Sequence, residues 1–267
     1  MYLIDTHSHI YDEAFDDDRD AVIERCKAAG VGRIMLPDID SGSRGRMFDL
    51  ARRHTSLCLP MAGLHPTSVN DNPRWRDELD AVERLLREPP VERLYGIGET
   101  GLDLYWSDAY LTEQTESLHA QIELALQYDL PVVIHTRSAW ERMTDVIRAY
   151  RGRGLRGIFH AFSADPDLYR TLRACGDFVF GIGGVATFRN GRLDEAVRAI
   201  ALDEMVLETD SPYLTPEPLR GRRNESSYLT YICEKVAAVK GLAPDEVAAA
   251  TSLTAERIFR LDPLGGR

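Results

Sequence analysis

The sequence lacks any apolar stretch close to the roughly 20 residues that a membrane-spanning helix requires. Its 32 basic residues are outnumbered by 43 acidic ones, and the net charge of −11 excludes a broad basic surface, leaving only local basic contacts. It has only four cysteines and no CxxC pair, so we expect reduced thiols in a reducing compartment rather than disulfides. His7 lies where a targeting segment would stand, and we therefore expect no cleaved leader and a cytoplasmic location.

Short runs rich in Val, Ile and Leu alternate with longer amphipathic segments along the chain. Between the runs the apolar residues follow helical spacing; Leu118, Ile122 and Ala125, for example, lie on one face. Beyond the prolines that follow Asp210, the chain is also predicted to be helical, to about Arg260. Alternating strands and helices predict a parallel sheet, and eight units predict an α/β fold closed into a TIM (β/α)8 barrel, with residues 1–267 as a single domain. The candidate strands are residues 2–6, 31–36, 57–62, 94–98, 131–135, 156–160, 177–182 and 205–209.

Six side chains of metal-ligand type stand at the ends of five of these runs, on strands one, four, five, six and eight. They are His7, His9, Glu99, His135, His160 and Asp210. Barrel enzymes build their sites at the carboxyl ends of the strands, so closure would bring the six together. A lone histidine at a strand end is usually structural, but five strand ends in the correct order are hard to match by chance. The set therefore predicts a metal site.

Six ligands are too many for one tetrahedral zinc with an open position, and two divalent ions suit them better. Imidazole and carboxylate together are compatible with Zn, Mn, Mg, Ni or Fe. We expect Glu99 to bridge the ions, with His7, His9 and Asp210 on one and His135 and His160 on the other.

In this arrangement Glu99 and Asp210 are the candidate catalytic residues, since Asp210 could accept a proton from a metal-bound water. Asp5 continues the alternating row of His7 and His9 and could orient a ligand from behind.

Five further residues are candidate substrate contacts. His65 ends strand three and could donate a hydrogen bond to substrate, or it could simply cap the His-Pro turn. Arg137 lies two residues beyond His135, on the same side if the strand continues, and its guanidinium matches phosphate geometry. Arg222, Arg223 and Asn224 form the loop after strand eight, where a solvated charged face is the alternative.

Tyr105 and Trp106 could stack on bases of a single strand, or pack only within their own loop.

These residues resemble the TatD family of metal-dependent deoxyribonucleases over nearly the whole predicted barrel. The matching stretches are Asp5-Thr-His-Ser-His9, Gly63-Leu-His-Pro66, Ile97-Gly-Glu-Thr-Gly-Leu-Asp103, Pro131-Val-Val-Ile-His135, His160-Ala-Phe-Ser163, Phe180-Gly-Ile-Gly-Gly184, Glu208-Thr-Asp-Ser-Pro-Tyr213 and Gly221-Arg-Arg-Asn-Glu225. The resemblance implies an amidohydrolase-like TIM barrel, one or two divalent metals on the same six ligands, and hydrolysis of DNA, often from the 3′ end. The chain differs from the usual family pattern at Thr100, Ala161, Ala164 and Ser226. These differences remove no ligand, but they bear on loop shape and substrate preference.

Three functions remain open on these residues. The first is a deoxyribonuclease acting on single strands or 3′ ends, with DNA as its partner and with neither a membrane nor an obligate protein partner. The second is an amide, ester or aminoacyl-bond hydrolase on the same barrel, because an activated water attacks a carbonyl as well as a phosphorus. Related barrels often bridge their metals with a modified lysine on strand four, and Glu99 at that place favours the nuclease. The third is a metal-binding scaffold, which the intact ligand set argues against.

Overall fold

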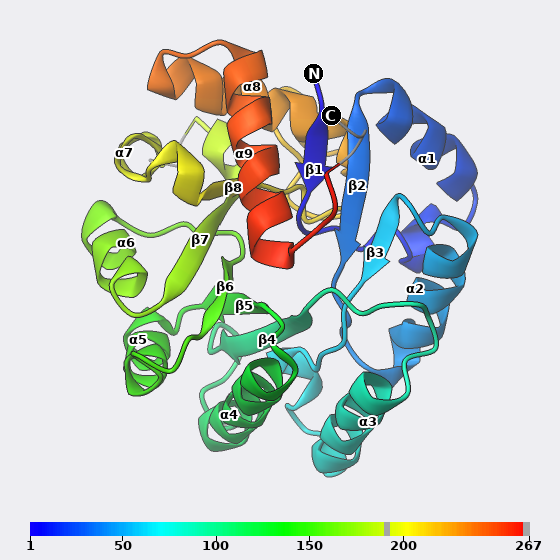
Figure 1. Ribbon diagram of the computed structural model, residues 1–267, viewed down its shortest axis with the longest axis vertical. Helices are drawn as coiled ribbons and strands as arrows, with labels where there is room; N and C mark the ends of the chain where they lie inside the picture. The colour runs from blue at the N-terminus through cyan, green and yellow to red at the C-terminus, as the bar shows by residue number, and fades with distance from the viewer. Residues whose placement is uncertain (190–192, 264–267) are drawn as a thin grey trace.

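A computed structural model describes residues 1–189 and 193–263, and within them eight strands alternate with helices along the chain (Figure 1). The strands are β1 (Leu3–Asp5), β2 (Val31–Leu36), β3 (Cys58–Pro60), β4 (Ile97–Asp103), β5 (Val132–Arg137), β6 (Arg156–Phe159), β7 (Asp177–Ile182) and β8 (Met205–Leu207). The α-helices are α1 (Arg19–Ala28), α2 (Ser41–Arg53), α3 (Trp75–Arg87), α4 (Leu111–Tyr128), α5 (Trp140–Ala149), α6 (Pro166–Arg173), α7 (Asp194–Ala199), α8 (Leu229–Lys240) and α9 (Pro244–Phe259). Short 3-10 helices cover Glu13–Phe15 (η1), Pro66–Ser68 (η2), Gly184–Thr187 (η3), Leu202–Glu204 (η4) and Ser226–Tyr228 (η5).

The strands close into a ring. β1, β2 and β3 pair in parallel, and β4 to β8 form a second parallel series. Two joints connect the series: Ala62 bridges to Ile97 between β3 and β4, and Thr6 donates its backbone N–H to the Leu207 carbonyl at 3.0 Å between β1 and β8. The predicted eight-stranded α/β barrel is confirmed, with the helices packed around the outside (Figure 1).

Apolar side chains fill both faces of this barrel. The outer layer packs between the strands and the surrounding helices. The inner layer takes one buried residue from most strands and is completed by Ile258 and Phe259 of α9, which lies across one end of the barrel (Figure 1). The amino-terminal end is therefore closed by apolar packing, and the carboxyl ends of the strands are left for polar chemistry. The strand residues of the inner layer are Ile4, Met35, Leu59, Val133, Ile158, Val179 and Val206.

The predicted strands agree with the structure to within two residues at each end except for β4, which begins at Ile97 rather than at residue 94. β4 was expected to stop at residue 98, but it runs to Asp103, so Glu99 lies inside the strand. β5 likewise continues to Arg137, which pairs with Asp103. The two extended strand ends pair with each other. Their backbones lie so close together that a Cβ on Gly101 would be 1.9 Å from the His135 carbonyl oxygen.

The carboxyl-terminal helical stretch is two helices rather than one. Gly241 ends α8 in the left-handed conformation, at φ 68°, which glycine adopts without a steric cost. None of the helices in residues 1–189 and 193–263 is long and apolar enough to cross a membrane. All four cysteines are buried and free, as expected for reduced thiols.

Candidate metal centre

The six predicted ligands converge at the carboxyl ends of the strands, at the floor of a cavity of about 910 Å³. His9, Glu99, His135, His160 and Asp210 line the cavity, while His7 lies beneath them and is fully buried. Three overlapping triplets within this set and His65 bring their ligand atoms within 4.8 Å of one another. The triplets are His7-His160-Asp210, His7-His9-Glu99 and His65-Glu99-His135.

Glu99 stands between two groups of histidines and turns one carboxylate oxygen to each. Its Oε2 lies 3.0 Å from His7 Nε2 and 3.7 Å from His9 Nε2. Its Oε1 lies 2.8 Å from His135 Nδ1 and 3.9 Å from His160 Nε2. A carboxylate with ligands on both sides has the geometry required to bridge two cations.

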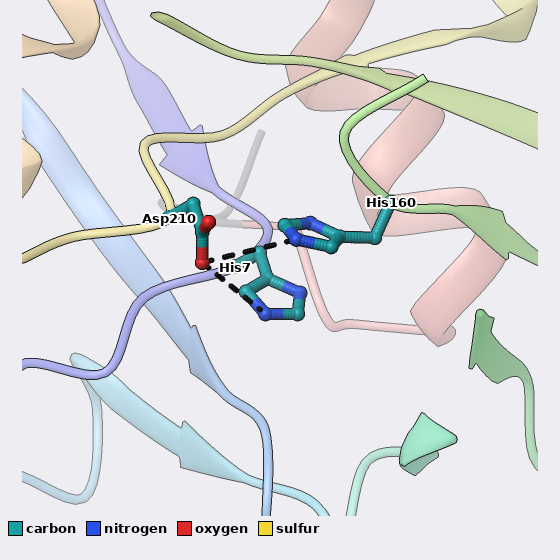
Figure 2. Close-up of side chains that lie close together, drawn as sticks. All are labelled: His7, His160 and Asp210. Carbon is teal, nitrogen blue, oxygen red and sulfur yellow. Dashed lines mark ion pairs between the residues drawn. The ribbon is translucent and has the colours of Figure 1, made fainter. Parts of the chain in front are cut away.

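Asp210 covers the same cluster from the end of β8. Its Oδ1 lies 3.4 Å from His9 Nε2 and 3.8 Å from Nε2 of both His7 and His160. Figure 2 shows the carboxylate facing the two rings of His7 and His160, which stack with centroids 3.5 Å apart. The backbone of Asp210 is left-handed, at φ 56°, a conformation that aspartate tolerates better than most residues and that turns the chain at the strand end.

The electrostatics of the cluster call for positive charge. Burial alone would raise the pKa of Glu99, but His7 and the other surrounding histidines hold it well below its usual value. Burial lowers the pKa of His135 and His160, but the carboxylates around them outweigh it. Asp103 and Glu99 raise the pKa of His135 to about 9, and Glu208 and Asp210 raise that of His160 to about 10. Without a metal, protons on the histidines neutralise the carboxylates of the cluster. Divalent cations would take over that role, and the imidazole and carboxylate groups present fit such ions.

A hydrogen-bond relay fixes which nitrogen of His9 faces the cluster. The Tyr11 hydroxyl donates its proton to the Pro37 carbonyl at 2.5 Å, so it can only accept from His9 Nδ1 at 2.9 Å. His9 therefore carries its proton on Nδ1 and presents the lone pair of Nε2 to Glu99 and Asp210.

Carboxylates hold two other rings. Glu208 Oε1 lies 2.9 Å from His160 Nδ1 and also accepts the Ala161 N–H at 2.5 Å. Gly181 makes room for it, because a Cβ there would lie 2.2 Å from Glu208 Oε2. Asp103 Oδ2 lies 3.0 Å from His135 Nε2. Such partners orient ligand histidines and raise their basicity.

Tyr11 and Glu208 were not identified from the sequence, although a signal for each is present. Tyr11 continues the alternating row of His7 and His9, and Glu208 stands two residues before Asp210.

Asp5 was expected to orient a ligand ring, and the structure corrects this. Its carboxylate accepts the Thr209 N–H at 2.9 Å, the Thr209 hydroxyl at 2.6 Å and the backbone N–H of His7 at 3.3 Å. These bonds fasten the end of β1 to the chain after β8 and reach no imidazole nitrogen. Burial raises the pKa of Asp5 to about 7.

The predicted substrate contacts divide into two groups. His65 and Arg137 line the cavity. No described lining residue comes from the Arg222–Asn224 loop, contrary to expectation. Asn224 is fully buried and donates to the carbonyls of Thr209 and Tyr213, at 2.8 and 2.6 Å.

The other two residues of that loop also lie outside the described lining of the cavity. Arg223 donates to Asp18 at 2.8 Å and to the Ala14 carbonyl at 2.6 Å, and Arg222 is exposed. The Asn224 amide therefore holds the loop after β8, and Arg223 fastens that loop to the segment after β1.

Comparison with known proteins identifies one family. The family described as TatD related DNase matches residues 4–260. The chain is 34% identical over 265 residues to the uncharacterized metal-dependent hydrolase YabD of Bacillus subtilis (strain 168), covering 97% of this chain and 100% of that protein. It is 32% identical over 264 residues to the 3′-5′ ssDNA/RNA exonuclease TatD of Erwinia tasmaniensis, covering 97% and 100%.

Solved structures show the same relationship. The crystal structure of YJJV, a TatD homolog from Escherichia coli K12, superimposes with a TM-score of 0.89 at 25% identity, covering 97% of this chain and 98% of that one. A TatD family hydrolase from Entamoeba histolytica shares the fold, with a TM-score of 0.85 at 19% identity, covering 98% and 99%. By its sequence, its barrel and its metal-dependent relatives, the chain belongs to the TatD family of metal-dependent hydrolases.

Proposed function

We propose that this protein is a metal-dependent nuclease that hydrolyses phosphodiester bonds at the 3′ end of DNA, with residues 1–267 as one catalytic domain. One observation carries the proposal: the two oxygens of Glu99 face two separate histidine groups on the floor of an open cavity. Two divalent ions bound there, of Zn, Mn, Mg, Ni or Fe, would acidify a water and neutralise the charge of a phosphoryl group.

The candidate ligands lie on both sides of Glu99. His7, His9 and Asp210 would hold one ion, and His135 and His160 would hold the other. Tyr11, Glu208 and Asp103 hold three of these rings in place. Asp210 would also accept the proton of the attacking water, because its carboxylate lies at the cavity surface beside the histidines.

The wall of the cavity suits an unpaired nucleotide. Arg137 lies over the ring of Tyr105, with its guanidinium carbon 3.6 Å from the ring centroid, and 5.8 Å from that of Trp106. Tyr105 and Trp106 are 54% and 71% exposed, and their rings lie edge to face with centroids 4.8 Å apart. Exposed rings stack on bases only where the bases are unpaired, and a guanidinium beside them can bind the phosphate. We therefore propose single-stranded DNA as the preferred substrate.

Two further observations support this reading. The Erwinia tasmaniensis relative is named as a 3′-5′ ssDNA/RNA exonuclease. The net charge of −11 leaves a local contact at Arg137, assisted by bound cations, as the means of holding a polyanion.

Four buried free thiols are compatible with the cytoplasm, which is the location we propose.

The test is nucleotide release from a single-stranded oligonucleotide labelled at either its 5′ or its 3′ end, with Mg²⁺, Mn²⁺ or Zn²⁺ added to metal-free protein. We expect mononucleotide release from the 3′ end in wild type and none in Glu99→Ala. Duplex DNA and ester, lactone and aminoacyl-tRNA substrates are assayed in parallel. Absence of metal-stimulated release from any DNA, with hydrolysis of one of the acyl substrates, would replace the nuclease by the acyl hydrolase.

A further inference from the structure

His65 differs from His9 in the ring nitrogen that carries its proton. It is the N-cap residue of η2, and its Nδ1 accepts the backbone N–H of Thr67 at 3.2 Å. The Thr67 hydroxyl lies 2.7 Å from the same nitrogen. A backbone N–H can only donate, so Nδ1 must present a lone pair. In a neutral imidazole the proton then resides on Nε2.

The fold aims Nε2 of His65 at the site, and the side chain is only 13% exposed. Its Nε2 lies 3.5 Å from Glu99 Oε1, and its ring packs edge-on against that of His135 with centroids 4.7 Å apart. His65 therefore directs an N–H toward the cavity, next to one oxygen of the carboxylate that divides the two histidine groups.

His9 has the opposite arrangement. Its Nδ1 faces a hydroxyl whose own proton is given to Pro37, so Nδ1 is the donor and Nε2 is left with a lone pair that points into the cluster. In His160 it is likewise Nδ1 that lies beside an acceptor, 2.9 Å from the Glu208 carboxylate. A metal ligand must offer a lone pair, and the lone pair of His65 is occupied by Thr67 on the side away from Glu99.

We propose that His65 is not a metal ligand, although it offers a ring nitrogen within 4.8 Å of ligand atoms of Glu99 and His135. Instead, His65 donates a hydrogen bond from Nε2 to a phosphate oxygen of the substrate. The identity of the acceptor rests on the proposed nuclease function, while the tautomer and the metal count do not. A neutral imidazole gives a hydrogen bond without transferring its proton, so it stabilises negative charge on the phosphate through the reaction.

The first test reads the tautomer directly, by long-range ¹H–¹⁵N NMR of histidine-labelled full-length protein, with His65 assigned from its absence in His65→Asn. We expect Nδ1 without a proton and Nε2 with one, before and after Zn²⁺ is added. A protonated Nδ1, or an Nε2 signal that shifts to that of a metal-bound nitrogen, overturns the proposal.

The second test separates donor from ligand. His65→Asn keeps an acceptor for the Thr67 N–H, since asparagine is a good N-cap, but is too short to reach Glu99. We expect it to bind as many Zn²⁺ ions as wild type, with affinity within about threefold, whereas the control His135→Asn loses an ion or about tenfold in affinity. Loss of an ion in His65→Asn refutes the proposal.

The third test uses thymidine 5′-monophosphate as the probe, bound to Zn²⁺-loaded protein and measured by calorimetry. We expect His65→Asn to bind it about 10-fold more weakly, as the loss of one hydrogen bond to a charged group predicts. Equal affinity would refute the donor role even if DNA is cleaved. If no DNA is cleaved but the tautomer, the metal count and the weakened nucleotide binding all hold, the proposed function fails and the donor assignment stands.

Discussion

Replacing Glu208 by glutamine should change how metal binding depends on pH. Glu208 Oε1 lies 2.9 Å from His160 Nδ1, and a unit charge at that distance is worth on the order of 5 kcal/mol at an effective dielectric of about 20. The pKa of His160 rises from 6.5 to about 10, which corresponds to about 5 kcal/mol. Burial opposes the rise, and Asp210 and Glu99 contribute to it, so in Glu208→Gln the pKa of His160 should fall back toward its usual value.

The direction in which metal affinity changes with pH follows from competition between metal ions and protons for the histidines. In wild type at about pH 8, His135 with a pKa of about 9 and His160 with a pKa of about 10 are both protonated, and each must lose its proton to bind an ion. Metal affinity should therefore rise with pH, by up to a factor of about 100 per pH unit for two protons. In Glu208→Gln only His135 retains the competing proton, and the rise should drop to about tenfold per unit.

Apparent affinity at about pH 8 should change little, because two effects offset each other. Relief from proton competition strengthens binding by about 100-fold, while loss of the carboxylate behind a ligand histidine weakens it by about 10- to 100-fold. The discriminating measurement is calorimetric titration of metal-free protein with Mn²⁺ between about pH 7 and 9, in buffers of different ionisation enthalpy, which counts the protons released. Glu141→Gln, an exposed change on α5, is the control. If Glu208→Gln releases as many protons as wild type, the assignment of the raised pKa to Glu208 is wrong.

Three further single substitutions have expected effects on metal binding, substrate binding or stability. Tyr11→Phe removes the acceptor that fixes the His9 proton and should weaken Mn²⁺ binding about 10-fold; unaltered affinity would contradict the relay. The same change leaves the Pro37 carbonyl without its donor and should lower the free energy of unfolding of the metal-free protein by about 1–3 kcal/mol. Trp106→Ala should cost about 1–3 kcal/mol of single-strand binding, seen as a higher KM with little change in kcat, while a lower kcat at constant KM would exclude stacking. Asn224→Ala leaves two carbonyls without their donor and should lower the free energy of unfolding by about 2–4 kcal/mol, measured by urea denaturation of metal-free protein. A loss below about 0.5 kcal/mol there would show that the Asn224 amide does not hold the loop.

The barrel and the convergence of the six candidate ligands were predictable because both depend on local patterns. A strand of alternating residues places His7 and His9 on one side, and a polar residue directly after an apolar run marks the carboxyl end of a strand. The same patterns could not foresee that β4 and β5 extend each other past Glu99 and His135, since that extension needs the two strands paired. Nor could they show that Asn224 would be buried against the chain after β8.

By itself, the sequence determined the kinds of chemical groups present and the order in which strands carry them, because hydrophobic periodicity acts over a few residues. Only the tertiary structure decided what each group does. Which nitrogen of His9, His65 or His160 bears a proton depends on Tyr11, Thr67 and Glu208, and the Pro37 carbonyl that settles His9 reaches the relay only because β1 and β2 pair. These are directional contacts, some of them between segments far apart in the chain, and no local pattern contains them.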